Sequence, residues 1–89
     1  MKANSWTITY DPLSLLGETT DSTQLEDAAR EAGEDIVQAK HGSTILDLGW
    51  YRDRYRVFVV EDHNWTRPVR QFEAFDLRSA LTSFRDSMI

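Results

Sequence analysis

The two histidines are the side chains best suited by type to acid–base chemistry near neutral pH. Ser43 lies two residues after His41, and Glu61 and Asp62 directly precede His63. A serine, a histidine and a carboxylate form a catalytic triad only through their geometry, and no nucleophile-elbow, phosphate-loop or helix-borne metal-ligand motif is present. The chain also has no cysteine, which excludes thiol catalysis and cysteine-ligated zinc. The sequence therefore predicts a protein that is not an enzyme and that holds no cofactor or metal.

Arginines and aromatic side chains alternate in the stretch WYRDRYR, residues 50–56. Such interleaving is typical of nucleic-acid-binding surfaces, but tyrosine, tryptophan and arginine are also enriched at the hot spots of protein interfaces. The polar centre, Arg52, Asp53 and Arg54, is suited to a turn between two strands. We expect its two arginines at a hairpin tip beside Tyr51, partly neutralised by nearby acids and aromatic rings.

The net charge of −5 is divided unevenly along the chain. Residues 1–40 carry three basic and eight acidic side chains, whereas residues 41–89 carry seven arginines and seven acidic side chains. The whole net charge therefore belongs to the first half. An acidic segment repels nucleic acid and anionic membranes and attracts basic partners.

Acidic side chains are expected to form columns on a helix predicted over about residues 22–40. Asp27, Glu31 and Asp35 follow one another at intervals of four residues. The neighbouring column holds Glu26, Arg30 and Glu34. Like charges one turn apart destabilise a helix by about 0.2–0.5 kcal/mol per pair. Either the face simply keeps a small protein soluble, or it imitates a row of phosphates and docks on a basic groove.

Alternation and turn residues predict the strands. Trp6, Ile8 and Tyr10 share one face of a first strand that ends at Pro12. Three further strands are predicted over residues 43–51, 55–61 and 67–75.

Apolar spacing and capping residues predict two helices. The first, over about residues 22–40, contains Gly33 and is expected to end at His41 and Gly42. The second is capped by Asp76. Its apolar stripe consists of Leu77, Ala80, Leu81, Phe84 and Met88.

The predicted order is β-α-β-β-β-α in a single compact domain, residues 1–89. The simplest packing is an α+β fold, an antiparallel sheet with two helices packed on one face. The succession helix, three strands, helix resembles that of double-stranded-RNA-binding domains, whose last helix begins with phosphate-binding lysines. Here that helix begins with Asp76, Leu77, Arg78 and Ser79, so the resemblance covers the order of elements and not the chemistry.

The sequence favours a small acidic binding protein that inhibits or neutralises a basic partner protein, such as a nuclease or a nucleic-acid-binding effector. In size and charge it resembles anti-CRISPR and toxin-immunity proteins. The predicted partner-binding residues are Glu26, Asp27, Glu31, Glu34, Asp35, Tyr51, Arg52, Arg54 and Trp65. A tryptophan in a polar loop such as residues 62–66 more often covers a core than contacts a partner. The alternative function is nucleic-acid binding through Arg52, Arg54, Arg56, Arg67 and Arg70.

Location and assembly follow from bulk properties. No apolar run approaches the roughly 20 residues that cross a bilayer, and the first ten residues lack the apolar stretch of a signal peptide. We expect a cytoplasmic protein that does not enter membranes. A free edge strand would offer a route to a homodimer.

Overall fold

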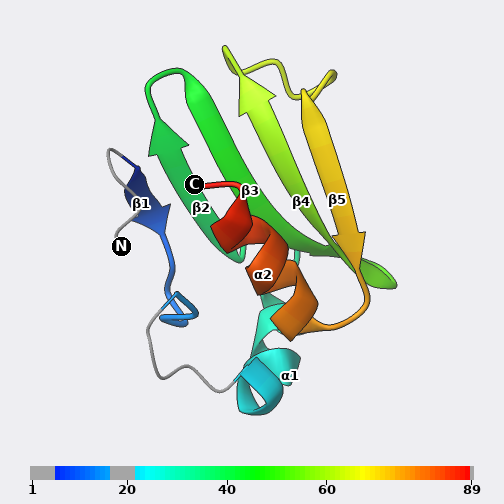
Figure 1. Ribbon diagram of the computed structural model, residues 1–89. Helices are drawn as coiled ribbons and strands as arrows, with labels where there is room; N and C mark the ends of the chain where they lie inside the picture. Colours follow the sequence, from blue (N-terminus) through cyan, green and yellow to red (C-terminus); the bar gives the residue numbers. More distant parts are fainter. Residues whose placement is uncertain (1–5, 17–21, 89) are drawn as a thin grey trace.

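The computed structural model describes residues 6–16 and 22–88, which form one five-stranded antiparallel sheet and two helices (Figure 1). The strands lie side by side in chain order, from β1 at one edge to β5 at the other. The elements are β1 Thr7–Tyr10, α1 Ser22–Ala32, β2 Val37–His41, β3 Thr44–Tyr51, β4 Arg54–Glu61, β5 Arg70–Ala74 and α2 Leu77–Asp86. The predicted α+β class, an antiparallel sheet with two helices, is confirmed.

The first helix is shorter than predicted, and this adds a strand. α1 ends at Ala32, and Gly33 follows with a φ of 70°, the left-handed conformation that commonly stops a helix. The chain then enters β2, where Val37 and Ala39 pair with residues of β3 and turn their side chains into the core. Pairing with β3, a long strand rich in apolar residues, outweighs the helical spacing of Val37 and Ala39. Four strands therefore separate the helices, and His41 ends a strand instead of a helix.

The hairpin predicted within residues 50–56 is present. β3 and β4 pair along their length with Tyr51 opposite Arg54, so Arg52 and Asp53 alone form the turn. Arg52 has a φ of 67°, as the first residue of a tight two-residue hairpin turn requires. The next strand, β5, covers only Arg70–Ala74, so it is shorter at both ends than the predicted segment 67–75.

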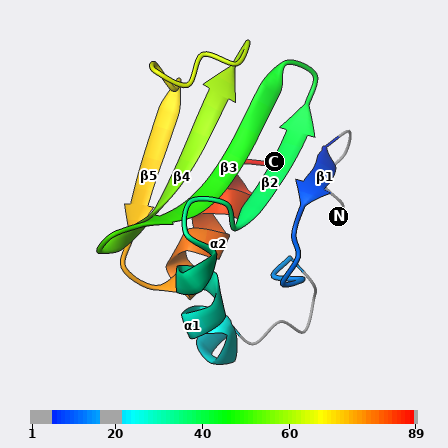
Figure 2. The same ribbon diagram turned by 180° about the vertical axis from the view of Figure 1, so that it is seen from behind.

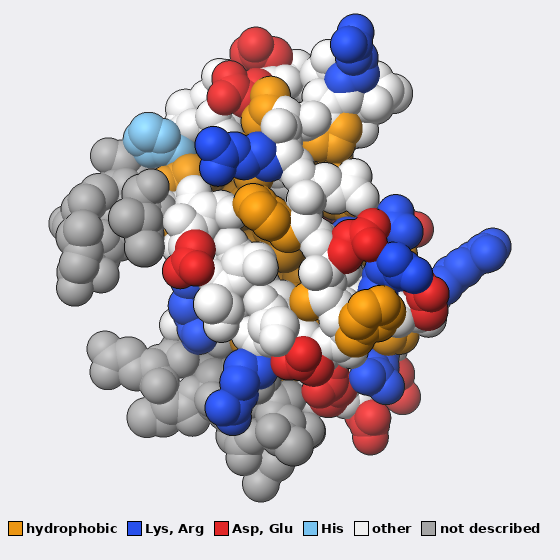
Figure 3. Space-filling model, turned by 45° about the vertical axis from the view of Figure 1, so that its right-hand side comes forward, with side chains coloured by type: hydrophobic (Ala, Val, Ile, Leu, Met, Phe, Trp, Pro, Cys, Tyr) orange, Lys and Arg blue, Asp and Glu red, His pale blue; other side chains and the backbone are white. Residues whose placement is uncertain are grey.

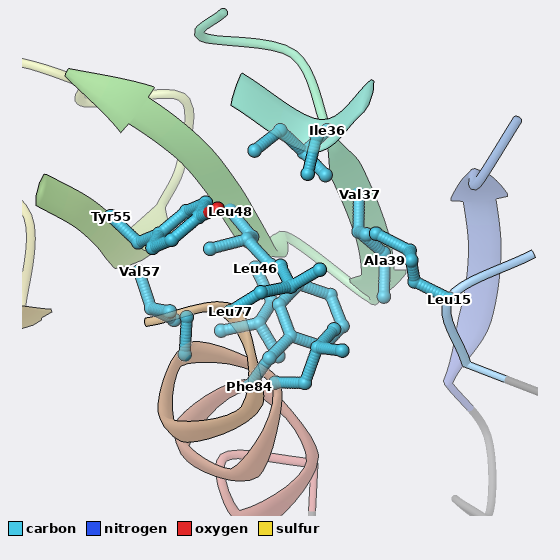
Figure 4. Packing of buried hydrophobic residues seen from close by; sticks show 13 residues of the cluster. Leu15, Ile36, Val37, Ala39, Leu46, Leu48, Tyr55, Val57, Leu77 and Phe84 are labelled. Carbon is cyan, nitrogen blue, oxygen red and sulfur yellow. The ribbon is translucent and has the colours of Figure 1, made fainter. Parts of the chain in front are cut away.

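α2 covers one face of the sheet with the stripe that the sequence predicted. Asp76 caps the helix by accepting a hydrogen bond from the backbone N–H of Ser79 at 2.9 Å. Leu77 and Phe84 are fully buried against apolar side chains of β2, β3 and β4 (Figure 4). Each large apolar side chain buried in this way contributes about 1.5–3 kcal/mol relative to exposure.

The opposite face of the sheet is covered by no helix in the described part of the chain (Figure 2). We call it the open face. Because side chains alternate along a strand, the residues that do not point at α2 lie here. Residues that are paired across neighbouring strands point to the same face of the sheet. The register therefore places these residues on the open face: Gln38, Asp47, Tyr51, Arg56, Phe58 and Glu73.

Candidate partner-binding surface

Two of the three hairpin arginines, Arg54 and Arg56, are paired within the protein, whereas Arg52 at the tip is exposed and forms no ion pair among the described residues. Arg54 donates two hydrogen bonds of 3.0 Å to the carboxylate of Asp53 and one of 2.8 Å to Glu73. Nε of Arg56 is buried and lies 3.6 Å from Glu73 Oε2. The hydrogen bond from Arg54 lowers the pKa of the Glu73 carboxyl. In Figure 3 acidic and basic side chains are intermixed at the lower right of the molecule, without a single positive patch.

The hairpin's aromatic side chains divide between the two faces. Trp50 lies edge-on to Tyr55 with ring centroids 4.7 Å apart, on the side of the helices. Tyr51 lies on the open face, where its ring meets Phe58 edge-on at 5.6 Å and the Arg56 guanidinium lies 5.8 Å from its centroid. Of these rings, only Tyr51 and Phe58 contribute to a surface on the open face.

Trp65 is not brought together with the hairpin. It lies in the β4–β5 loop, and the hairpin tip with Arg52 lies at the other end of β4 (Figure 1). Trp65 is 45% exposed and is not among the described side chains that pack on the core, so its interpretation as a lid is wrong. The predicted residues Arg52 and Trp65 therefore lie at opposite ends of β4 and do not form one cluster.

Glu26, predicted to bind a partner, is engaged inside the protein. Its Oε2 accepts a hydrogen bond of 2.7 Å from the hydroxyl of the buried Tyr55 and one of 2.8 Å from the backbone N–H of Leu77. Arg30 adds an ion pair at 3.6 Å. A carboxylate beside the first residue of α2 also interacts favourably with the positive end of the helix dipole. Glu26 thus joins α1, β4 and α2, and we leave it out of the proposed partner-binding surface.

The predicted column of acids is broken where α1 ends. Asp27 and Glu31 are exposed on α1, whereas Glu34 and Asp35 are exposed in the connection to β2. Two backbone hydrogen bonds hold this connection against β3, Trp50 N–H to the Gly33 carbonyl at 2.7 Å and Ile36 N–H to the Leu48 carbonyl at 3.0 Å.

A glycine in β3 allows this close approach. A Cβ atom at Gly49 would collide with the backbone carbonyl oxygen of Glu34. Gly49 lies on the open face, so Glu34 and Asp35 pass over the end of that face, as the loop between α1 and β2 does in Figure 2. Burial raises the pKa of the Tyr51 hydroxyl to about 12, with smaller contributions from Asp47 and from the carboxylates of Glu34 and Asp35.

A pocket of about 340 Å³ lies where this connection meets the sheet. Its lining comes from β1, from the connection before β2, and from β2 and β3: Thr9, Tyr10, Asp35, Val37, Gln38 and Asp47. Asp47 is only 6% exposed and accepts a hydrogen bond of 3.3 Å from the Gln38 amide. Burial, with smaller contributions from Asp35 and Glu34, raises the pKa of its carboxyl to about 6, although Gln38 opposes the shift.

Asp47 was not among the predicted site residues, although the sequence contains a signal for it. It is a charged side chain flanked by Ile45, Leu46 and Leu48 in the middle of a strand. Alternation places it on the face away from Leu46 and Leu48, but only the fold shows that this position is buried. A buried carboxyl with a shifted pKa in a pocket is a common mark of a functional site.

The features that suggested catalysis are not assembled into a site. His63 is exposed in the β4–β5 loop, and His41 lies at the end of β2 against Trp6, with ring centroids 5.3 Å apart. The described residues contain no group of three or more His, Cys, Asp or Glu side chains that could hold a metal ion.

None of the described helices is long and apolar enough to span a bilayer. Comparison of the chain with protein-family models, with curated proteins and with solved structures finds no match.

Proposed function

We propose that this chain is a small non-enzymatic binding protein that docks on a basic surface of another protein and thereby inhibits or neutralises it. The nucleic-acid groove of a nuclease or of an effector complex would provide such a surface. The observation that carries the proposal is that four neighbouring acids are exposed and, in the described part of the chain, unpaired, whereas two of the three hairpin arginines are already paired. Asp27, Glu31, Glu34 and Asp35 are exposed and form no ion pair within the described ranges, whereas Arg54 and Arg56 share Glu73.

This distribution favours a basic partner for physical reasons. Exposed carboxylates without counter-ions create a negative potential that raises the rate at which a basic surface is encountered. The four side chains, which we call the acidic surface, lie in one short segment of chain, Asp27 to Asp35. Of the five arginines that the nucleic-acid alternative requires, Arg54 and Arg56 already share Glu73, which weakens that alternative.

The proposal is tested by capturing and then measuring a partner. The immobilised protein is exposed to a panel of purified nucleases and to a nuclease-treated extract of its host. We expect a basic protein to be retained and its nucleic-acid-directed activity to fall. A gel shift of nucleic acid with micromolar protein at low salt would favour the alternative function instead.

Matched charge reversals then locate the binding surface. Asp27→Lys/Glu31→Lys changes the acidic surface, and Glu61→Lys/Asp86→Lys makes the same change in net charge at exposed sites on β4 and α2. The first variant should weaken binding by about tenfold or more, because each reversed contact replaces an attraction with a repulsion. The control should change affinity about twofold at most. Equal effects of the two variants would contradict a specific acidic surface.

A further inference from the structure

The pocket beside β2 combines a buried negative charge with room for a ligand. Asp47 lies in the middle of β3, and only 6% of the residue is exposed. A carboxylate buried to this extent normally has an arginine, a lysine or several N–H donors as partners. Here Oδ2 receives one long hydrogen bond from Gln38, and no hydrogen bond to Oδ1 occurs within the described residues.

The charges around Asp47 do not compensate it. The charged groups that act on it are Asp35 and Glu34, and both are negative. The arginines of the hairpin are directed elsewhere, Arg54 to Asp53 and Glu73 and Arg56 to Glu73 and Tyr51. No ion pair to Asp47 is present in the described parts of the chain. The pocket is therefore a site of negative potential that lacks a cation.

The walls of the pocket suit a planar cation. Tyr10, a residue that is 46% exposed, provides an aromatic ring, and the exposed residue Asp35 provides a second carboxylate. A guanidinium group forms paired hydrogen bonds with a carboxylate and stacks on aromatic rings, whereas an ammonium group is a compact and more strongly hydrated point charge. A volume of about 340 Å³ accommodates a guanidinium group with the alkyl chain that carries it.

We propose that this pocket receives the side chain of an arginine from the partner protein, with Asp47 as the buried acceptor, Asp35 as a second acceptor and Tyr10 as the stacking surface. The inference rests on the proposed function, since it identifies a residue type on the basic partner. It assigns the two surfaces different tasks. Asp27 and Glu31 on α1 attract the partner, and the pocket, which includes Asp35, holds one of its side chains in place, as buried anchor residues do at interface hot spots.

The experiment uses small probes and needs no partner protein. The full chain labelled with ¹⁵N is titrated with N-acetyl-arginine amide, with its lysine counterpart and with the citrulline counterpart, which has the shape of arginine but no charge. We expect saturable shifts at the amides of Tyr10, Gln38 and Asp47 with arginine, weaker binding with lysine and none with citrulline. Asp47→Asn should weaken arginine binding at least tenfold, and Asp86→Asn, at an exposed site on α2 outside both surfaces, should leave it unchanged.

The outcomes separate the two proposals. Binding of citrulline as tight as that of arginine, or unchanged arginine binding by Asp47→Asn, would overturn the pocket assignment. Equal affinity for lysine and arginine would overturn the guanidinium preference. If arginine does not bind while Asp27→Lys/Glu31→Lys still weakens partner capture, the proposed function stands and the pocket inference falls. If arginine binds and no basic partner is retained, the pocket assignment stands and the proposed function falls.

Discussion

Replacing Asp47 with asparagine should stabilise the protein at neutral pH, because the change removes a charge that the fold buries. The residue is 6% exposed, and its one hydrogen-bond donor within the described ranges is the Gln38 amide. Burial disfavours the ionised form and raises the pKa of the carboxyl from 3.8 to about 6. Asparagine has nearly the same shape and can accept the same hydrogen bond, so the variant isolates the effect of the charge.

The direction of the pKa shift fixes the sign of the effect. The folded protein binds the Asp47 proton more tightly than the unfolded chain, so the free energy of unfolding falls as the pH rises between the two pKa values. One pKa unit corresponds to about 1.36 kcal/mol. A rise from 3.8 to about 6 therefore costs about 3 kcal/mol of stability at pH 7, and little below about pH 4, where the carboxyl is protonated in both states.

Urea unfolding of the natural protein and of Asp47→Asn between about pH 4 and pH 8 measures this cost. The advantage of the variant should grow from less than about 1 kcal/mol at pH 4 to about 3 kcal/mol at pH 7 and then level off. Asp86→Asn, at the exposed end of α2, corrects for the loss of one negative charge. A difference that does not change with pH, or a variant less stable at pH 7, would refute the reasoning. A stabilised variant that no longer binds arginine would show a functional reason for retaining a costly side chain.

Three further changes test how the site is supported, each by urea unfolding. Glu26→Ala should lower the free energy of unfolding by about 2–3 kcal/mol, because it leaves the buried hydroxyl of Tyr55 without an acceptor. Alanine at an exposed acid of α1 should change it little, and equal losses would contradict the structural role of Glu26. Gly49→Ala should cost about 1–3 kcal/mol, because the new Cβ displaces the carbonyl of Glu34. Asp76→Ala should cost about 1 kcal/mol through loss of the α2 cap. Since a hydrogen bond from the Ser79 backbone lowers the Asp76 pKa, the cap's contribution is present above the unfolded-state pKa and should be lost as the pH falls through the lower folded-state pKa.

The features that were predicted correctly depend on neighbours in sequence. The α2 stripe repeats at helical spacing behind a capping aspartate, and the β3–β4 hairpin follows from two alternating segments around a polar turn. The pairing of Arg54 with Asp53 is also local, because the two residues are adjacent. Each of these predictions needed only the preferences of a few consecutive residues.

The end of α1 was predicted wrongly because two patterns coincide. Ile36 and Ala39 continue the helical spacing of the apolar residues before them, while Val37 and Ala39 alternate as a strand does. The left-handed conformation of Gly33 ends the helix, and pairing with β3 makes the following segment a strand. Gly33, which was expected to lie inside the helix, instead ends it.

The sequence by itself determined the distribution of charge, the antiparallel α+β class, the hairpin and the absence of a recognisable catalytic motif. The tertiary structure decided which acids remain available. Glu26 is held by Tyr55 and Leu77, more than 25 residues away in the chain. Asp47 becomes buried only in the folded sheet, where it lies between β2 and β4 and lines a pocket together with β1 and the connection before β2. Burial and pKa depend on which distant segments exclude water from a side chain, and no local pattern contains that information.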